Sequence, residues 1–497
     1  MSSPRKELKN RLYNARVVHI IGFTGTEGES AVKLLSVHTG AKTALHDIAG
    51  RDSLWESYRR AREFFPAKTV EKNFSELINL CNDLRVGGDY LSGIDPRDII
   101  LLPQDWDRYP ENRKAVDSHH EKGGLAFLIF DLYYLFCRGK IIGITGTKGK
   151  TTSVHLTLNL LKSWGKEAYI SGNDRYSKQM LPEIHEMKED SWLILETSNR
   201  HLKHSLFKPD IAMITNIDID HLEEHNNDPQ QYINTKLRII EKHSCAIIPL
   251  KVYSMNRENI DTGGLILFSL KKPPSDIRAS HPVIYLKDGI ITAEYMGAER
   301  KLFSADNIDK SIYRSNLLMV SGLACYLDIP SFILPEAFNQ DLGIKSRFEF
   351  IGTKSGINFI DDLSATTPYA TIQAIESVKG NIILVCGGET KGNDYSFFIQ
   401  SLENTRIKRA YILDNENLKS SLINGLSDKM KNSSKIILAT SFRDTITDAY
   451  DYAKPGDTII LSPACAGFYS NFVKSRANAF RVHFRMLKTK LQDQSNE

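Results

Sequence analysis

The stretch Lys140-Ile-Ile-Gly-Ile-Thr-Gly-Thr-Lys-Gly-Lys-Thr-Thr152 decides the fold, because an apolar strand runs into a glycine-rich turn and then into a Lys-Thr pair that opens a helix. Backbone N–H groups at such a helix N-terminus point at an anion, Lys150 can reach terminal phosphates, and the Thr151 hydroxyl can ligate Mg²⁺. The sequence therefore predicts a P-loop that binds ATP or GTP. The alternative interpretation is a glycine-bearing strand-to-helix turn with a solvated lysine.

The glycine spacing departs from the strict GxxxxGK[ST] pattern. Ile144 stands where the first glycine is expected, and Gly143 comes one residue too early. What remains is Gly146-x-x-Gly149-Lys150-Thr151-Thr152, followed by a predicted helix over 152–164. Strand, turn, Lys-Thr pair and helix thus occur in the order that the motif demands.

The composition limits the kind of protein. A chain of 497 residues is too long for one hydrophobic core and suggests roughly three domains. Its 64 basic and 60 acidic residues give a net charge of +4 and are spread along the chain, so neither a nucleic-acid nor a membrane partner is indicated. Six scattered cysteines without a CxxC pair indicate buried free thiols in a reducing compartment. The N-terminus has no apolar signal segment and no long apolar run follows, so we expect a soluble, cytoplasmic protein.

A second glycine-rich turn lies near the N-terminus. A predicted strand over 17–21 leads into Gly22-Phe-Thr-Gly25-Thr-Glu-Gly28, a helix over 30–38 and a strand that ends at Asp47. The spacing is GxxGxxG, which favours a phosphate-binding turn in a parallel sheet over a dinucleotide fingerprint. Asp47 is either an acceptor for a ribose or base, or a turn residue.

Alternating strands and helices continue after the P-loop. Predicted strands over 191–196 and 210–217 end at Glu196 and before His221, and a predicted helix over 229–243 contains Lys236. We expect a loop over 269–280 and a helix over 315–327. Further strands are predicted over 359–362, 382–388, 410–413 and 458–462. These elements predict three consecutive α/β domains, whose ligand groups lie at strand ends.

Eight ordered motifs resemble those of the Mur ligase family. They are Gly-Thr-Lys-Gly-Lys-Thr-Thr152, Glu196-Thr-Ser198, Thr215-Asn-Ile-Asp-Ile-Asp-His221, Lys236-Leu-Arg-Ile239, Ser346-Arg347-Phe-Glu349, Ile360-Asp-Asp362, Ala365-Thr366 and Leu461-Ser-Pro-Ala-Cys-Ala466. The resemblance implies a Rossmann-like N-terminal domain that binds a UDP-linked substrate (1–138), a central P-loop ATPase domain (139–341) and a Rossmann-like C-terminal domain that binds an amino acid (342–497).

The resemblance also implies a reaction. Mur ligases use ATP to phosphorylate a carboxylate and let an amine attack the acyl phosphate, which gives an amide, ADP and phosphate. Phosphoryl transfer depends on positioning and charge neutralisation, so it needs cations and metal ligands. The implied amino acid is D-glutamate and the implied acceptor is UDP-N-acetylmuramoyl-L-alanine, in peptidoglycan precursor synthesis. We expect a monomer that uses ATP and two Mg²⁺ ions.

The resemblance assigns roles to particular residues. The implied catalytic residues are Lys150, His221 and Lys236. Thr151 and Glu196 would hold one Mg²⁺, and His221 with Lys236 a second; Lys236 would act as a carbamate formed with CO₂, because an ammonium cannot ligate a metal. The implied ATP contacts are Gly146, Thr147, Lys148, Gly149, Lys150, Thr151, Thr152, Asn316, Arg347 and Asp362. The implied contacts of the UDP-linked substrate are Gly25, Thr26, Asp47, Asn173 and Ser198, and those of the amino acid are Thr366 and Lys391.

Some positions depart from the family pattern, mostly on the substrate side. The family sequence Ser-Lys-Ala-Thr after Asp362 becomes Leu363-Ser364-Ala365-Thr366, so a basic residue is missing from the amino-acid turn. An expected serine is Gly467, and an expected phenylalanine falls at Ser475. A Ser-Pro-Gly turn becomes Leu102-Pro103-Gln104, and an expected glutamine is His201.

Three other functions remain open at this point. One is a Mur-type ligase that joins a different amino acid to a related UDP-linked acceptor. A P-loop regulator or kinase is disfavoured by Lys236 and by the lack of an Asn-Lys-x-Asp motif where one is expected. An inactive nucleotide-sugar-binding relative is disfavoured because Lys150, Glu196, His221 and Arg347 are all present.

Overall fold

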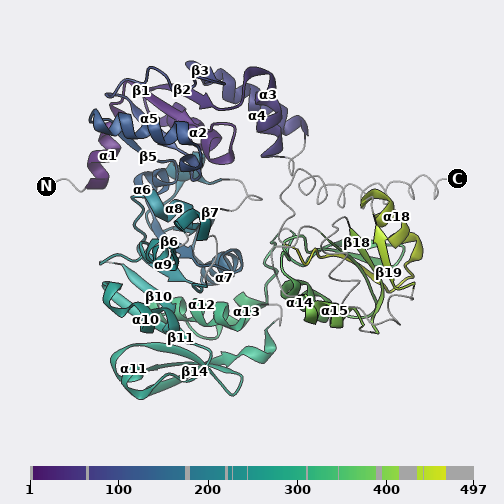
Figure 1. Cartoon of the computed structure of the whole chain (residues 1–497). Helices are drawn as coiled ribbons and strands as arrows, with labels where there is room; N and C mark the ends of the chain where they lie inside the picture. Colours follow the sequence, from purple (N-terminus) through teal and green to yellow (C-terminus); the bar gives the residue numbers. More distant parts are fainter. Residues whose placement is uncertain are drawn as a thin grey trace. The chain divides into compact units, whose positions relative to one another are not determined.

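The computed structural model has three β-sheets in chain order, with helices between the strands (Figure 1). It describes residues 4–62, 67–173, 179–218, 222–226, 228–242, 244–308, 312–344, 346–387, 395–403, 405–413, 434–439 and 442–465. Two predicted site residues, His221 and Lys391, lie outside these ranges, as do Gly467 and Ser475. Contacts divide the chain into one unit over Met1–Leu342 and another over Gly343–Glu497.

The first sheet is entirely parallel, in the order β3-β2-β1-β4-β5. Its strands are β1 (Val17–Ile21), β2 (Lys42–Asp47), β3 (Asp83–Val86), β4 (Ile99–Leu102) and β5 (Leu125–Leu128). The helices of this region are α1 (Pro4–Tyr13), α2 (Thr26–His38), α3 (Arg51–Arg60), α4 (Ala67–Asn79), α5 (Pro110–Glu121) and α6 (Asp131–Phe136). The chain adds β2 and β3 on one side of β1 and then β4 and β5 on the other, so that the strand order changes direction between β1 and β4. In a Rossmann-like sheet, ligands bind at the carboxyl ends of the strands beside this point.

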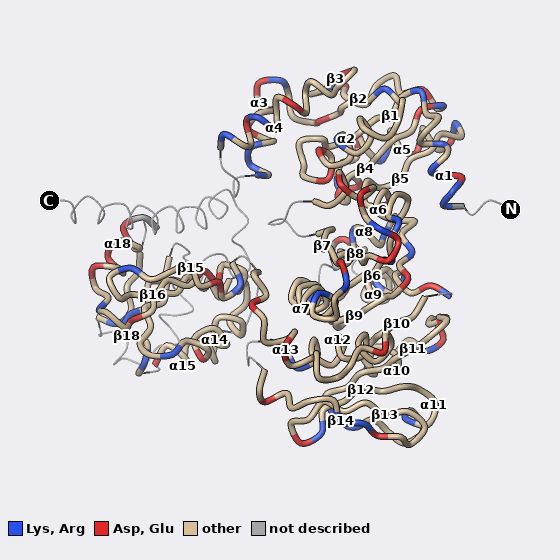
Figure 2. Tube along the Cα trace, turned by 180° about the vertical axis from the view of Figure 1, so that it is seen from behind, with Lys and Arg blue, Asp and Glu red and all other residues tan. Residues whose placement is uncertain are grey.

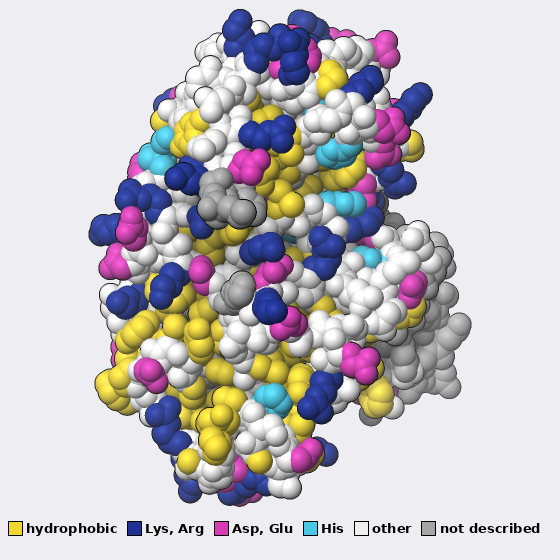
Figure 3. Space-filling model, turned by 90° about the vertical axis from the view of Figure 1, so that its left-hand side faces the viewer, with side chains coloured by type: hydrophobic (Ala, Val, Ile, Leu, Met, Phe, Trp, Pro, Cys, Tyr) yellow, Lys and Arg dark blue, Asp and Glu magenta, His cyan; other side chains and the backbone are white. Residues whose placement is uncertain are grey.

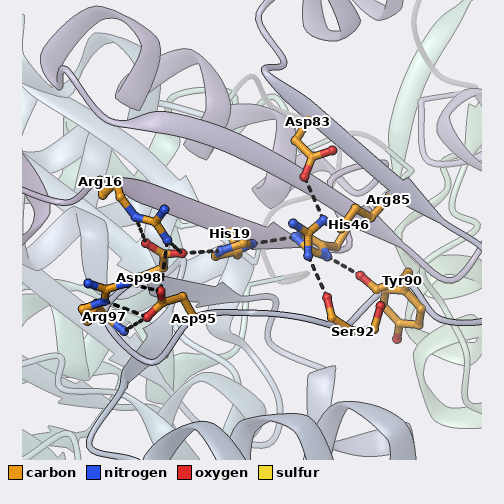
Figure 4. A network of polar contacts seen from close by, with 10 residues as sticks. All are labelled: Arg16, His19, His46, Asp83, Arg85, Tyr90, Ser92, Asp95, Arg97 and Asp98. Atoms are coloured by element: carbon orange, nitrogen blue, oxygen red, sulfur yellow. Dashed lines mark hydrogen bonds and ion pairs between the residues drawn. The ribbon is translucent and has the colours of Figure 1, made fainter.

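A buried polar network crosses the first sheet (Figure 4). His19 Nδ1 lies 2.8 Å from His46 Nε2, and His46 Nδ1 lies 2.5 Å from the carbonyl oxygen of Tyr90. Because a carbonyl only accepts, His46 Nδ1 carries the proton, and its Nε2 accepts from His19. Burial lowers the pKa of His19 and lowers that of His46 to about 4. Both imidazoles lie inside the sheet; because a neutral His19 has a single N–H, which it donates to His46, its Nε2 only faces Asp98, at 3.3 Å.

The second sheet has nine strands, in the order β14-β13-β12-β11-β10-β9-β6-β8-β7. They are β6 (Lys140–Thr145), β7 (Ala168–Gly172), β8 (Trp192–Glu196), β9 (Ile211–Ile214), β10 (Cys245–Pro249), β11 (Gly264–Ser269), β12 (Val283–Lys287), β13 (Ile290–Tyr295) and β14 (Ala298–Ser304). Its helices are α7 (Lys150–Ser163), α8 (Asn199–His204), α9 (Pro229–Leu237), α10 (Leu250–Asn256), α11 (Ser275–Ser280), α12 (Arg314–Tyr326) and α13 (Ile333–Asn339). Strands β6 to β12 are parallel, whereas β13 and β14 add an antiparallel extension.

The predicted loop over 269–280 is wrong in part, because α11 occupies its second half. Pro274 precedes this helix and Asp276 lies in its first turn, which are both favourable for helix initiation. The first two sheets share one buried apolar cluster, in which the rings of Phe130 and Phe207 are 5.0 Å apart. The chain therefore has no break in its core near residue 138, and the boundary between 138 and 139 stays a prediction.

The second unit contains a six-stranded sheet in the order β15-β16-β20-β17-β18-β19. Its strands are β15 (Glu349–Lys354), β16 (Ile357–Asp361), β17 (Ile382–Gly387), β18 (Ile407–Leu413), β19 (Ile436–Ala439) and β20 (Thr458–Leu461), and its helices include α14 (Pro368–Ser377), α15 (Ser396–Leu402) and α18 (Phe442–Tyr452). All strands are parallel except β15, which pairs antiparallel with β16. The predicted α/β fold class is confirmed.

Charged side chains of both signs are distributed along the described chain (Figure 2) and intermix on the face shown in Figure 3. Neither view shows a broad surface of one sign. In the part of the chain that the structure describes, no helix is both long enough and apolar enough to cross a bilayer.

Candidate nucleotide and metal site

The loop between β6 and α7 requires glycine at two positions. Gly146 has φ +149°, and a β-carbon there would lie 1.9 Å from Thr215 Oγ1. Gly149, the N-cap of α7, has φ +81°, and a β-carbon there would lie 2.7 Å from Asn316 Oδ1. Both positions combine a left-handed backbone with a close neighbour. The loop therefore leaves its backbone open above the N-terminus of a 14-residue helix, as a phosphate cradle requires.

Residues that follow β9 in the sequence form hydrogen bonds with this loop. Asn216 Oδ1 accepts from Lys148 N at 3.0 Å, and Asn216 Nδ2 donates to Lys148 O at 2.9 Å. The Thr147 hydroxyl donates to Asp218 O at 2.8 Å and lies 2.9 Å from the Tyr232 hydroxyl. Sequence reasoning gave Asn216 and Tyr232 no role. The position of Asn216 at a strand end beside the P-loop strand was the signal that could have found it.

Two lysine ammonium groups meet at one carbonyl oxygen of the loop. Lys150 Nζ donates to Gly146 O at 2.9 Å, and Lys236 Nζ, from α9, donates to the same oxygen at 3.1 Å. Lys236 is 2% exposed, and its ammonium lies 4.8 Å from the centre of the Tyr232 ring. Two positive charges at one acceptor in a buried setting favour an anion beside them. The structure thus brings together Lys150 and Lys236, which lie 86 positions apart in the numbering.

Glu196 lies at the carboxyl end of β8 and is buried. Its Oε1 accepts from Asn173 Nδ2 at 3.3 Å, whereas its Oε2 has no hydrogen-bond partner among the described residues. The neighbouring backbone is close: Asn173 N donates to Glu196 O at 3.0 Å, and a β-carbon at Gly172 would lie 2.4 Å from that oxygen. A buried carboxylate oxygen without a partner is costly unless a ligand or cation occupies the space beside it.

The donor set fits Mg²⁺. Carboxylate and hydroxyl oxygens, with phosphate oxygens and water, are the ligands that this ion prefers, and Glu196 and Thr151 supply the first two. Thr151 is half-buried in the first turn of α7. Within the described ranges, no three His, Cys, Asp or Glu side chains lie close enough together to hold a metal, and His221 is outside those ranges.

Asn316, near the start of α12, adds a second unsatisfied polar atom beside the loop. It is 1% exposed, and its Nδ2 has no partner among the described residues. Its amide faces Gly149 closely enough to exclude any side chain there. An amide donor buried in this way beside a phosphate loop is suited to a nucleotide acceptor.

The first sheet presents its own glycine turn at the carboxyl end of β1. Gly25 is the N-cap of α2 and Thr26 is its first residue. Asp47 is buried, and its carboxylate accepts from the Thr24 hydroxyl at 2.7 Å, from Thr24 N at 3.3 Å and from Ala49 N at 3.0 Å. Of the two interpretations left open for Asp47, these three hydrogen bonds support the turn-stabilising one directly.

Loops of the first two sheets meet beside Glu196. The Ser198 hydroxyl donates to Gln104 Oε1 at 2.8 Å, and Gln104 Nε2 lies 3.4 Å from Asn173 Oδ1. His201 Nε2 lies 2.8 Å from Glu27 Oε1. Gln104 and Glu27 were not predicted as site residues, because each is more than 65 positions away from its partner in the sequence.

The second unit contains the other predicted residues. Arg347 is exposed between two non-glycine residues with positive φ, Ser346 at +58° and Phe348 at +49°. Such backbone strain is found mainly at functional sites. Asp362 accepts from Phe348 N at 3.0 Å and from the Ser462 hydroxyl at 2.7 Å, and burial raises its pKa to about 7. Thr366 is half-buried, and its backbone N–H donates to Ser364 O at 2.9 Å.

Comparison with known proteins gives matches over both units. Residues 144–305 match the Mur ligase middle domain, and residues 346–465 match the Mur ligase, glutamate ligase domain. The UDP-N-acetylmuramoylalanine–D-glutamate ligase of Chlorobium luteolum is 31% identical over 493 residues, covering 95% of this chain and 98% of that protein. The chain belongs to the Mur ligase family. The protein of the same name from Thermoanaerobacter sp. (strain X514) is 28% identical over 439 residues, covering 83% of this chain and 89% of that protein.

A solved Mur ligase structure has the same fold. The UDP-N-acetylmuramate–alanine ligase MurC from Thermotoga maritima is 14% identical and has a TM-score of 0.56, with 95% of this chain and 99% of that chain covered. Mur ligases are ATP-dependent enzymes that form ADP, and the chain is an enzyme of this class. The predicted family is therefore confirmed, whereas the roles of single residues stay predictions.

Proposed function

We propose that the chain joins D-glutamate to UDP-N-acetylmuramoyl-L-alanine in peptidoglycan precursor synthesis, with ATP as the energy source. The observation that carries this proposal is the arrangement at the P-loop: two ammonium groups at Gly146 O and a buried Glu196 oxygen without a protein partner. Relatives that carry the name of this reaction match nearly the full chain, which supports the choice of substrates.

The acceptor carboxylate takes the γ-phosphoryl group of ATP, and the amine of the amino acid then displaces phosphate to form the amide. Lys150 neutralises charge on the β- and γ-phosphates, and the N–H groups from Gly146 to Thr152 cradle them. Glu196 and Thr151 hold Mg²⁺, which neutralises charge on the transferring group when bound. Asn316, Arg347 and Asp362 contact ATP. Because the reaction needs positioning and charge, no covalent nucleophile of the protein takes part.

Lys236 acts as a carbamate in this proposal. Its neutral amine adds to CO₂ and releases a proton, so that a carboxylate replaces the ammonium and, with His221, holds a second Mg²⁺. The change also removes one of the two positive charges at Gly146 O and supplies oxygen atoms beside the phosphates.

The remaining predicted residues bind the acceptor and the amino acid in this proposal. Gly25 and Thr26 bind the UDP part beside the turn that Asp47 holds, Asn173 and Ser198 lie beside the sugar-peptide part, and Thr366 and Lys391 bind the side-chain carboxylate of D-glutamate. A hydroxyl and a cation are the expected partners of that carboxylate.

One observation favours a second candidate, a Mur-type ligase for a different amino acid. Ser364 is half-buried in the turn after Asp362, at the position where the family pattern that the chain resembles has a lysine, so that this turn carries one positive charge fewer than that pattern. A weaker preference for acidic side chains follows directly from the loss.

The test is ATP-dependent phosphate release by the purified protein with UDP-N-acetylmuramoyl-L-alanine, a panel of D- and L-amino acids, and mass spectrometry of the product. We expect turnover with D-glutamate and a product of the corresponding mass. Turnover with a neutral or basic amino acid in place of D-glutamate would establish the second candidate instead. UDP-N-acetylmuramate as a matched acceptor, lacking only the alanine, controls for acceptor recognition.

A further inference from the structure

Gln104 links the first sheet to the metal-ligand carboxylate through a chain of side-chain contacts. It lies two residues after β4, where its backbone N–H donates to Glu27 Oε2 at 3.2 Å. Its side chain extends to the second sheet. Oε1 accepts from the Ser198 hydroxyl at 2.8 Å, and Nε2 donates to Asn173 Oδ1 at 3.4 Å. Asn173 Nδ2 in turn donates to Glu196 Oε1 at 3.3 Å.

The directions of the hydrogen bonds in this chain follow from its Glu196 end. At this end, a carboxylate oxygen of Glu196 can only accept, so Asn173 must turn its NH₂ group toward it and its oxygen toward Gln104. At the other end, the Ser198 hydroxyl accepts from the backbone N–H of His201 at 3.2 Å and donates to Gln104 Oε1 at 2.8 Å. This contact agrees with the orientation of the Gln104 amide that the Glu196 end requires.

Gln104 is also held from the side of the first sheet. Glu27 accepts from the Gln104 backbone with one carboxylate oxygen and faces His201 Nε2 with the other, at 2.8 Å. The His201 ring is fully buried and stacks on Phe130, with 4.1 Å between ring centres. Since Glu27 lies in the first turn of α2, directly after Thr26, the position of Gln104 is tied to the glycine turn of the first sheet.

We infer that Gln104 is a positioning residue: it orients Asn173 so that Glu196 is held by one oxygen and presents the other, Oε2, to the metal ion. The inference rests on the proposed function only through the metal role of Glu196. It also provides a physical connection between the acceptor side of the site and the metal ligand, because the residues on both sides of Gln104 belong to the predicted acceptor contacts. Removing the amide lets Asn173 rotate, and Glu196 Oε2 loses its fixed direction.

The test is binding of Mn²⁺ in the presence of ADP, followed by electron paramagnetic resonance of the free ion, for wild type and Gln104→Met. Partners behind metal ligands typically contribute about tenfold or more to metal affinity, so we expect the Kd for Mn²⁺ to rise roughly tenfold. The matched control is Gln340→Met, since Gln340 also donates its amide to a serine, Ser163, but at an exposed position away from the loop. Its Kd should equal that of wild type.

A double-mutant cycle separates positioning from a general loss of structure. If Gln104 acts through Asn173, then Gln104→Met in an Asn173→Ala background should leave the Mn²⁺ affinity within about twofold of Asn173→Ala alone. Additive losses would overturn the inference. So would unchanged Mn²⁺ affinity in both Gln104→Met and Gln104→Ala, a second variant that leaves room for water at this half-buried position. If the protein ligates no amino acid and yet shows the cycle, the proposed function fails and the positioning role stands.

Discussion

The buried carboxyl of Asp362 makes the stability of the second unit depend on pH. Asp362 lies directly after β16, and burial raises its pKa from the ordinary value of 3.8 to about 7. The perturbation is Asp362→Asn, which keeps the size and an acceptor for Phe348 N while it removes the charge. The NH₂ group can donate to Ser462 Oγ, which in turn can donate to Thr371 at 2.8 Å.

The sign follows from the raised pKa. The folded state favours the protonated carboxyl, so its stabilising contribution is complete below about pH 4 and is lost as pH rises through about 7. The difference between the ordinary pKa and the raised pKa corresponds to ~4 kcal/mol in the free energy of unfolding. Roughly 2–3 kcal/mol of this is lost between pH 5 and pH 8. The asparagine variant does not ionise. It should therefore be more stable than wild type at pH 8, by a margin that shrinks toward pH 5.

The assay is differential scanning calorimetry at both pH values. For a unit of this size, the difference in Tm between Asp362→Asn and wild type should change by roughly 5–10 °C between pH 5 and pH 8. Asp457→Asn is the control of opposite sign. Burial by itself would raise the pKa of Asp457, but hydrogen bonds from Lys408, Lys454 N and Asn381 lower it overall. That variant should be less stable than wild type at pH 5 and at pH 8 by nearly the same margin, because the stability contributed by a lowered pKa is lost only below about pH 4. A margin for Asp362→Asn that is the same at pH 5 and pH 8 would refute the reasoning.

Three further predictions concern the P-loop. Lys150→Ala should lower the rate of ADP formation by roughly two to three orders of magnitude, because it removes the charge that balances the phosphates. A folded variant with near-normal turnover would reject this role. Lys236→Ala should lose most activity and recover part of it in the presence of a small carboxylate such as acetate, whereas an active variant that acetate does not affect would exclude the carbamate. Gly146→Ala should abolish ADP binding measured by calorimetry, because a β-carbon would lie 1.9 Å from Thr215 Oγ1. Thr215→Ala in the same chain should restore binding only in part, since the backbone strain, worth about 1–3 kcal/mol, remains.

The elements around the P-loop could be predicted because their signals are local. The apolar run, the glycines and the Lys-Thr pair are consecutive, and β6 and α7 begin within two residues of the predicted positions. The predicted helix over 229–243 is longer than α9, which ends at Leu237. The apolar pattern continues beyond that residue, but Ile239 and Ile240 already lie in the turns that lead toward β10.

The contacts of Gln104 could not be predicted, because they depend on how two sheets meet. Its partner Ser198 is 94 positions away, and no local pattern distinguishes this glutamine from a solvated one. The antiparallel strands β13 and β14 were missed for another reason. β14 contains three consecutive charged residues, which do not give the alternation that identifies a strand.

Those same charges matter for the behaviour of the protein at high concentration. β14 is the outermost of the nine described strands in its sheet and, among them, pairs only with β13 on its inner side. Its outer edge presents unpaired backbone groups, to which a strand of another molecule could add. Glu299, Arg300 and Lys301 are all exposed there, so that a second copy pairing with this edge would have to desolvate these charged side chains. The open edge of the largest sheet is thus protected against intermolecular strand pairing by its own sequence.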